Sequence, residues 1–407
     1  MAVEVLIIGA GPAGALAAAL LCRQGVDVLV LEREQFPRFS IGESLLPQSM
    51  EYLEQAGMLG AVARAGFQTK TGAAFGRGEE YTEFDFANKF SEGWSYTYQV
   101  PRAQFDQLLA HEAERQGADI RFRQDVLAVD LSGTRPRVTV VDEQNNSSIV
   151  EAGFILDASG FGRVLPRLLN LEKPSSFPVR GALFTHVEDH ISPRAFDRNK
   201  IRINVQPDRC DLWYWLIPFS DGRCSIGVVG EIEALARYQG TKFDRLRALI
   251  AEDGATAGLL AQARWDTPVR QLVGYASNVS SLWDRGYALL GNAGEFLDPI
   301  FSSGVTIALK SASLAAALVP RQLAGAPLNW EQEFALPLRQ GVDTFRAFVH
   351  SWYRGDLQRI IFDPRPRTEI RLMIAAILAG YAWDRNNPYV IQTGRRLAAL
   401  AELCYQR

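Results

Sequence analysis

The sequence predicts an α/β fold, and three features in different parts of the chain indicate this class. Residues 1–32 read as a strand, a glycine-rich turn, a helix and a second strand, which is the pattern of a parallel βαβ unit. Residues 166–269 hold apolar runs separated by turn residues, as in "RINVQPDRCDLWYWLIPFSDGRCSIGVVG", and predict antiparallel strands. From residue 331 the apolar residues recur at helical spacing, as in "EQEFALPLRQGVDTFRAFVHSWYRG".

The composition is that of a globular protein with two or three lobes. The 407 residues are 47% apolar and 22% charged, and the net charge of −3 does not favour nucleic-acid binding. The apolar runs are short, so no membrane span is expected, and the opening residues lack the regions of a signal peptide. Four cysteines without paired spacing indicate neither disulfides nor a metal site, so we expect a reduced, cytoplasmic protein.

Three glycines near the N-terminus form the pattern G-x-G-x-x-G. Gly9 permits a tight turn, Gly11 lets a pyrophosphate approach the backbone, and Gly14 lets the helix pack on the strand. The positive end of this helix, with Ala13 in its first turn, would face the phosphates. Glu32 ends the next strand, where a carboxylate can accept from a ribose hydroxyl. The pattern predicts a dinucleotide site; the alternative is a glycine-rich helix start without a ligand.

The order of three later segments resembles the FAD-binding lobe of glutathione-reductase-like flavoproteins and aromatic hydroxylases. The segments are "QVPRAQFDQLLAHEAERQGADI", "GFILDASGFGR" and "GYALLGNAGEFLDPIFSSGVTIALKSASLAAAL". The resemblance implies FAD, with Arg102 and Asn292 beside it and the helix near Gly304 directed at the flavin ring, although the family usually has Asp at 292. The alternative interpretation needs no ligand: Arg102 would be a charged residue that caps a helix, and Asp157 would be a turn residue at the end of a strand.

Four segments, in order over residues 1–360, resemble the flavin-dependent halogenases. "FPRFSIGESLLP" resembles the segment after the first βαβ unit, and "FQTKTGAAF" fits F-x-x-K-x-G-A-x-F with Lys70. "WYWLIP" fits W-x-W-x-I-P with Trp213 and Trp215, and "FLDPIFSSG" fits F-x-x-P-x-x-S-x-G. The resemblance implies an oxidoreductase that uses reduced FAD, oxygen, and chloride or bromide to halogenate an aromatic compound in secondary metabolism.

The resemblance also assigns roles to the motif residues. Trp213 and Trp215, on one face of a strand, would form a wall that keeps the substrate away from the flavin; the alternative is that they only pack between lobes. Lys70 would either hydrogen-bond and polarise hypohalous acid or form a haloamine, and both place electrophilic halogen beside the substrate; the alternative is a solvated surface charge. Backbone N–H groups at Ser303 and Gly304 would hold the halide, which is compatible with ordinary capping.

The expected partners follow from the same resemblance. By this resemblance a separate flavin reductase would supply the reduced FAD. No second G-x-G-x-x-G follows in the chain, but single-component aromatic hydroxylases also lack one, so this absence alone does not indicate a separate reductase. The residues expected to contact FAD are Gly9, Gly11, Ala13, Gly14, Glu32, Ser44, Arg102, Asn292, Pro299 and Gly304.

The substrate is expected to be a phenol- or pyrrole-like arene, either free or bound to a carrier protein. Free-tryptophan halogenases have a glutamate where this chain has Phe301, so a substrate that activates itself is favoured over an indole. The main alternative is a halogenase-like monooxygenase that hydroxylates its substrate. A flavin-dependent double-bond reductase and a non-catalytic flavin-binding protein are further alternatives. The four histidines receive no role from the sequence.

The chain is expected to form three parts. A discontinuous FAD-binding domain comprises residues 1–70, 96–165 and 270–325, a substrate lobe comprises 71–95 and 166–269, and a helical C-terminal region comprises 331–407.

Overall fold

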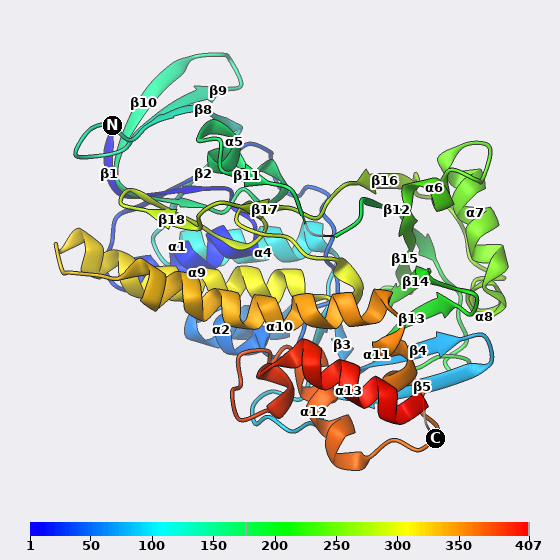
Figure 1. The fold of residues 1–407 in the computed structure, drawn as a ribbon. Helices are drawn as coiled ribbons and strands as arrows, with labels where there is room; N and C mark the ends of the chain where they lie inside the picture. Colours follow the sequence, from blue (N-terminus) through cyan, green and yellow to red (C-terminus); the bar gives the residue numbers. More distant parts are fainter. Residues whose placement is uncertain (176, 406–407) are drawn as a thin grey trace.

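The computed structural model describes residues 1–175 and 177–405, and two large β-sheets organise it (Figure 1). The first sheet has eight strands, and five of them run parallel in the order β19-β10-β1-β2-β7. These five are β19 (Tyr287–Leu289), β10 (Ser147–Asp157), β1 (Ala2–Ile8), β2 (Val28–Glu32) and β7 (Asp119–Phe122). Antiparallel strands β8 (Gln124–Asp130), β9 (Arg137–Asp142) and β18 (Trp283–Asp284) complete the sheet.

The second sheet has seven strands in the order β16-β12-β15-β14-β13-β4-β5. The strands are β16 (Arg270–Val273), β12 (Arg180–Glu188), β15 (Arg223–Glu231), β14 (Arg209–Pro218), β13 (Lys200–Gln206), β4 (Gly72–Arg77) and β5 (Glu80–Asp85). All neighbours are antiparallel except the parallel pair β13–β4. Two-stranded sheets join β3 (Gln68–Lys70) to β6 (Thr97–Gln99), and β11 (Glu172–Lys173) to β17 (Asn278–Val279).

Helices cover one face of the first sheet, the face that lies below the sheet in Figure 1. The central helix α1 (Pro12–Cys22) packs on α4 (Arg102–Arg115) and α9 (Ser303–Leu323), and α10 (Leu336–Tyr353) packs on α9. The remaining helices are α2 (Ser49–Gln55), α3 (Leu59–Arg64), α5 (Val164–Leu168), α6 (Ile232–Leu235), α7 (Lys242–Glu252), α8 (Gly254–Leu259), α11 (Asp356–Ile361), α12 (Thr368–Leu378) and α13 (Thr393–Tyr405). The predicted α/β class, with a largely antiparallel second sheet and a helical C-terminal region, is confirmed.

The boundaries of the three expected parts stay a prediction. Strand β16 begins at residue 270, where the third segment of the FAD domain was expected to start, yet it pairs with β12 in the seven-stranded sheet. Residues 406 and 407 of the expected C-terminal region lie outside the described residues.

Alternation along β1 explains why the first sheet is buried on both faces. Val5 and Ile7 belong to the large core cluster that includes the helices, whereas Leu6 and Ile8 pack with side chains of β8 and β9 on the other face. Successive strand side chains point to opposite faces, so a strand covered on both sides is apolar throughout. The run "VLIIGAG" therefore reflects a central parallel strand.

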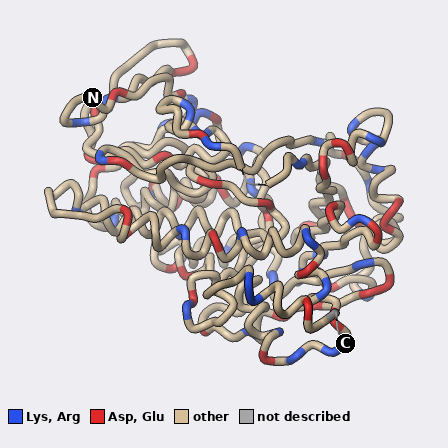
Figure 2. Tube along the Cα trace, viewed as in Figure 1, with Lys and Arg blue, Asp and Glu red and all other residues tan. Residues whose placement is uncertain are grey.

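Helix α9 is apolar because it lies in the core. Within the described residues it is the helix long and apolar enough to cross a membrane, but 61% of its most apolar window is buried inside the protein. Charges of both signs are interspersed along the trace, in keeping with a net charge of −3 (Figure 2).

Strand β14 carries the two tryptophans, and its neighbour β15 leaves room for one of them. Gly227 lies opposite Trp215 in the antiparallel pairing. A Cβ at Gly227 would lie 2.3 Å from carbons of the Trp215 ring, so the ring occupies the space over this glycine. The lack of a side chain at Gly227 is what lets the indole pack against this strand.

We expect Gly227→Ala to lower the free energy of unfolding by about 1–3 kcal/mol, because an added methyl group forces the indole out of its packed position. Gly258→Ala is the control, since a Cβ there meets no atom within 4 Å. It should leave stability unchanged or raise it by about 0.4–1 kcal/mol. Urea unfolding of both variants measures the difference, and equal effects would contradict the packing argument.

Candidate active site

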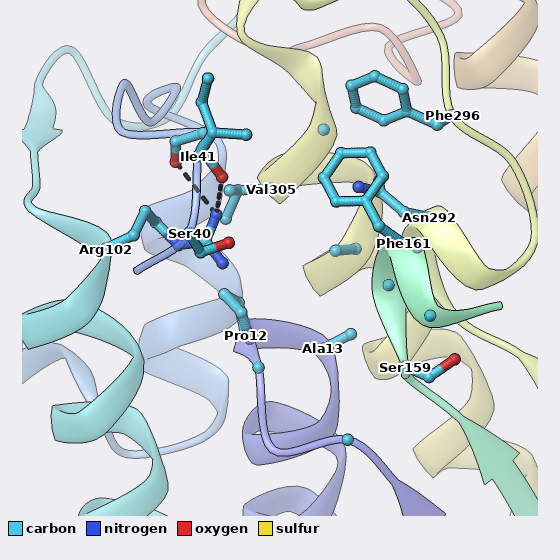
Figure 3. Close-up of a pocket in the computed structure, with 18 of the residues that line it drawn as sticks. Pro12, Ala13, Ser40, Ile41, Arg102, Ser159, Phe161, Asn292, Phe296 and Val305 are labelled. Atoms are coloured by element: carbon cyan, nitrogen blue, oxygen red, sulfur yellow. Dashed lines mark hydrogen bonds between the residues drawn. The ribbon is translucent and has the colours of Figure 1, made fainter. Parts of the chain in front are cut away.

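One cavity of about 360 Å³ lies between the two sheets, in the size range of small-molecule and cofactor sites. It is lined by the turn after β1, the segment 38–44, the turn after β10, the sheet face of β13 and β14, and parts of the segment 290–308. Figure 3 shows its centre, with Pro12 and Ala13 at the start of α1 between the segment 38–44 and the Phe161 turn.

The glycine turn forms the floor of the cavity at the start of α1. Gly9 has φ +96°, and a Cβ there would lie 2.6 Å from the carbonyl oxygen of Ala158. A Cβ at Gly14 would lie 1.9 Å from the carbonyl oxygen of Gly9, so helix and strand touch through this glycine. No side chain caps the start of α1 at Gly11. Its free N–H groups, together with the helix dipole, suit a phosphate group.

Glu32 closes the same end of the cavity. Its Oε2 accepts from the backbone N–H of Ala10 at 2.9 Å, and its Oε1 accepts from that of Glu34 at 2.9 Å. Each carboxylate oxygen has a second acceptor position, and Glu32 lines the cavity. The residue is therefore placed to accept hydrogen bonds from the hydroxyl groups of a ribose.

A buried ionic cluster holds the segment 38–44 against α4. Arg102 donates from Nε and Nη2 to the two carboxylate oxygens of Asp106, at 2.7 and 2.9 Å, and Arg38 Nη1 donates to Asp106 Oδ2 at 2.9 Å. Arg102 also donates to the carbonyl of Ile41 (Figure 3). Arg38 Nη2 lies 3.5 Å from the position of a Cβ on Gly11, so its charge reaches the glycine turn. The glycine turn, the uncapped start of α1 and the Arg38 cation together fit a pyrophosphate.

The opposite wall is aromatic. Phe161 and Phe296 form an edge-to-face pair with centroids 5.1 Å apart, and Asn292 lies beside them (Figure 3). Asp157 does not line the cavity: its Oδ1 accepts from the Ser159 N–H at 2.9 Å, its Oδ2 accepts from the Leu165 N–H at 2.7 Å, and burial raises its pKa. The reading of Asp157 as a strand-end turn residue is the one these bonds support.

Trp213, Trp215 and Ile217 face the cavity from β14 at alternate positions. The indole centroids are 5.9 Å apart. Trp215 Nε1 donates to Ser225 Oγ at 3.0 Å, and Trp213 Nε1 donates to Tyr353 Oη at 2.8 Å. Both indole nitrogens are therefore satisfied, and the tryptophan wall (Trp213 and Trp215) has fixed ring orientations.

A buried network ties the tryptophan wall to the loop before α9. Tyr353 Oη donates to Asp298 Oδ2 at 2.9 Å, and Tyr275 Oη donates to the same oxygen at 3.2 Å. Burial raises the pKa of Asp298, and the Arg180 charge opposes this shift. Arg180 lies over the Tyr353 ring, 3.4 Å from its centroid. The loop that carries Pro299 is thus connected to β14 through side chains.

The start of α9 meets the cavity beside the aromatic wall. Ser302 has φ +56° and gives the helix no side-chain cap. Ser302 and Gly304 line the cavity, whereas the Ser303 side chain is buried and does not. A Cβ at Gly304 would lie 3.4 Å from Phe296 and 3.9 Å from Asn292 Oδ1.

Lys70 lies behind the segment 38–44 and does not line the cavity. Its Nζ donates to Ser44 Oγ at 2.7 Å and to the Leu45 carbonyl at 2.8 Å, and it lies 5.4 Å from the centroid of the Phe86 ring. Lys70 is 1% exposed, and no carboxylate pairs with it among these contacts. Burial lowers its pKa from 10.5 to about 7. Ser44, which does line the cavity, is the contact between this amine and the cavity.

The structure gathers most of the predicted site residues around one cavity. Those that line it are Gly9, Gly11, Ala13, Glu32, Ser44, Arg102, Trp213, Trp215, Asn292, Pro299 and Gly304, and those that do not are Gly14, Lys70 and Ser303. The sequence reasoning named Glu43 and Phe296 only as motif residues and did not single out Arg38, Tyr275 or Phe161; all five also line the cavity. Arg38 and Glu43 lie in the quoted segment "FPRFSIGESLLP". Two charged residues in an otherwise mostly apolar segment were the signal that could have pointed to them.

Arg38→Met is expected to weaken FAD binding by tenfold or more, since losing a hydrogen bond to a charged group costs about 1.5–3 kcal/mol. Quenching of flavin fluorescence by the apoprotein gives the dissociation constant. Arg115→Met is the matched control, because Arg115 is 69% exposed at the far end of α4. An unchanged affinity in Arg38→Met would contradict the assignment of Arg38 to the pyrophosphate.

Lys70 is expected to make stability depend on pH. Between pH 7 and 10.5 the unfolded chain keeps the Lys70 proton and the folded chain has lost it. The free energy of unfolding therefore rises with pH in this window, and Lys70→Met should remove this rise. Urea unfolding of both proteins from pH 6 to pH 10 measures the difference. A wild-type minus variant difference that is constant with pH would show that the amine is charged when folded.

Comparison with known proteins agrees with this geometry. A family model described as an FAD binding domain matches residues 2–188. Over 334 residues the chain is 31% identical to a tryptophan 2-halogenase of Chondromyces crocatus, an alignment that covers 79% of this chain and 62% of that protein. The chain thus spans less than two thirds of the length of this relative.

Two further relatives match over nearly the whole chain. A 1H-pyrrole-2-carbonyl-[peptidyl-carrier protein] chlorinase of Pseudomonas fluorescens is 26% identical, covering 98% of this chain and 94% of that protein. The crystal structure of a flavoprotein/dehydrogenase from Cytophaga hutchinsonii is 45% identical with a TM-score of 0.97, covering 100% of this chain and 99% of that one. The glycine turn and the FAD-domain match agree that the chain is an FAD-binding flavoprotein, and its curated relatives show that it is similar to the flavin-dependent halogenases.

Proposed function

We propose that this protein is an FAD-dependent halogenase that acts on an electron-rich aromatic compound. The observation that carries the proposal is the tryptophan wall, whose two rings line the FAD cavity from the sheet side. With FAD bound in this cavity, the two rings would occupy space that a substrate would need for direct oxygen transfer. A halide ion is small enough to enter where an arene cannot.

When bound and reduced, FAD would supply the electrons with which oxygen converts a halide to hypohalous acid. Arg38, Arg102 and Glu32 would hold its pyrophosphate and ribose, and Phe161 with Phe296 would cover the other end of the site. The backbone N–H groups at the start of α9, near Ser303 and Gly304, would hold the halide, because they carry no side-chain cap.

Lys70 would receive the oxidant from the cavity, which lies on the other side of Ser44. A pKa near 7 leaves much of the amine neutral at physiological pH, and a neutral amine can act as a nucleophile toward electrophilic halogen. Because Ser44 separates the amine from the cavity, transfer would require the Ser44 hydroxyl to release Lys70 Nζ. Hydroxylation by a related monooxygenase would need no such lysine.

Phe301 supports a phenol- or pyrrole-like substrate over a free indole. Its ring packs edge-on against Phe348 and Trp352, with centroids 6.0 Å away in both cases, so this position offers no carboxylate to assist proton removal from an arene. The two curated relatives carry the names of different substrates, tryptophan and a carrier-bound pyrrole. We therefore propose a phenol or pyrrole, free or on a carrier protein, and a separate reductase as the source of reduced FAD.

The test combines purified protein, FAD, NADH, a flavin reductase, and chloride or bromide with free and carrier-bound phenols and pyrroles. Mass spectrometry should show a product with the halogen isotope pattern. Lys70→Met should lower its formation by about 10²-fold or more, as for loss of a residue that takes part in the chemistry. Lys242→Met, an exposed lysine at the start of α7, should keep wild-type activity.

Two outcomes would contradict the proposal. Oxygen insertion that persists without halide and in Lys70→Met would identify a monooxygenase. Consumption of reduced FAD without halogenation of any free or carrier-bound arene would exclude this substrate class.

A further inference from the structure

A second buried acidic group lines the cavity, and it pairs with a histidine on the seven-stranded sheet. Glu43 follows Gly42, which has φ +100°, and only 2% of Glu43 is exposed. Its Oε1 lies 2.5 Å from Nε2 of His186 on β12. Neighbouring Ser44 contacts Lys70 instead. The two consecutive residues therefore bond to strands of different sheets, Glu43 to β12 and Ser44 to β3.

The pair connects the inside of the cavity with the surface. Glu43 lines the cavity, whereas 20% of the His186 side chain is exposed to solvent. The His186 ring packs against Phe39 and Phe219, with centroids 5.9 and 5.2 Å away, and 37% of Phe39 is exposed. These two adjacent side chains therefore lie between bulk water and the cavity.

Other charged groups surround the pair but engage different partners. Arg270 lies over the Phe39 ring, Arg198 pairs with Asp189 and donates to the Phe219 carbonyl, and Arg223 pairs with Asp266. Arg102, on the cavity side, is bound to Asp106. Glu43 and His186 are thus bonded to each other, whereas these neighbouring charges engage other partners.

We propose that Glu43 and His186 form a proton-transfer pair that supplies the cavity with the proton that halide oxidation consumes. The inference rests on the proposed function, in which FADH₂ + O₂ + X⁻ + H⁺ gives FAD + HOX + H₂O. Two electrons come from FADH₂ and two from the halide, and both oxygen atoms are reduced. Glu43 releases a proton into the cavity, His186 returns one to Glu43, and solvent returns one to His186.

His190 and Glu188 offer a control pair in the same region. Glu188 belongs to β12, its Oε1 lies 3.4 Å from His190 Nε2, and the His190 side chain is 50% exposed. This pair has the same chemistry, but neither residue lines the cavity. It therefore separates an effect of the cavity from an effect of any surface histidine.

The first measurement follows the ring nitrogens of the histidines by ¹⁵N NMR. Only four histidines are present, so each can be assigned by substitution. Glu43→Gln and the addition of oxidised FAD should each shift the His186 resonances and leave those of His190 unchanged. A His186 spectrum that is indifferent to both would show that the pair does not face the cofactor site. This result is independent of any halogenation activity.

The second measurement tests proton supply by chemical rescue. Glu43→Ala should lower hypohalous acid formation by about 10²-fold, the usual contribution of a positioned acid, with FAD affinity unchanged. Added acetate should restore at least tenfold in proportion to its concentration, and Glu188→Ala should need no rescue. A wild-type rate in Glu43→Ala, or a loss that no weak acid restores, would overturn the inference while leaving halogenation by the wild type intact.

Discussion

The carboxylate of Asp106 is the contact on which the rest of the site depends. It is fully buried and accepts hydrogen bonds from two arginines, Arg38 and Arg102. An unpaired buried carboxylate is very costly, so both cations are held close to it, and Arg102 in turn holds the carbonyl of Ile41. This cluster positions the segment 38–44 over the glycine turn. The cofactor cavity, the contact to Lys70 and the contact to His186 all depend on that position.

The segment 38–44 therefore separates two chemical environments. On one side Lys70 is enclosed by Ser44, Leu45 and Phe86, and burial favours its neutral form. On the other side Glu43 has a histidine partner that reaches solvent. An amine that is partly neutral and a carboxylate that exchanges protons perform different tasks, and they need different surroundings. Adjacent residues of one loop make the two contacts, since Glu43 pairs with His186 and Ser44 accepts from Lys70.

The tryptophan wall shows how packing and function coincide at one position. Trp213 and Trp215 belong to the core cluster and are almost completely buried, as large aromatic residues usually are in a core. They nevertheless face the cavity, and Gly227, Ser225 and Tyr353 fix their orientation. The two interpretations of this motif, core packing and a wall beside the cofactor, are therefore compatible.

The sequence by itself determined the elements whose signals are local. Periodicity and turn chemistry predicted the βαβ unit and the α/β class, and four motifs indicated the similarity to flavin-dependent halogenases. Only the tertiary structure decided which motif residues meet. Glu43 and His186 are 143 residues apart, and Arg38 and Asp106 are 68 residues apart, so no local pattern links them. It also decided that Lys70 is enclosed behind Ser44, because burial depends on side chains from distant segments and not on its own motif.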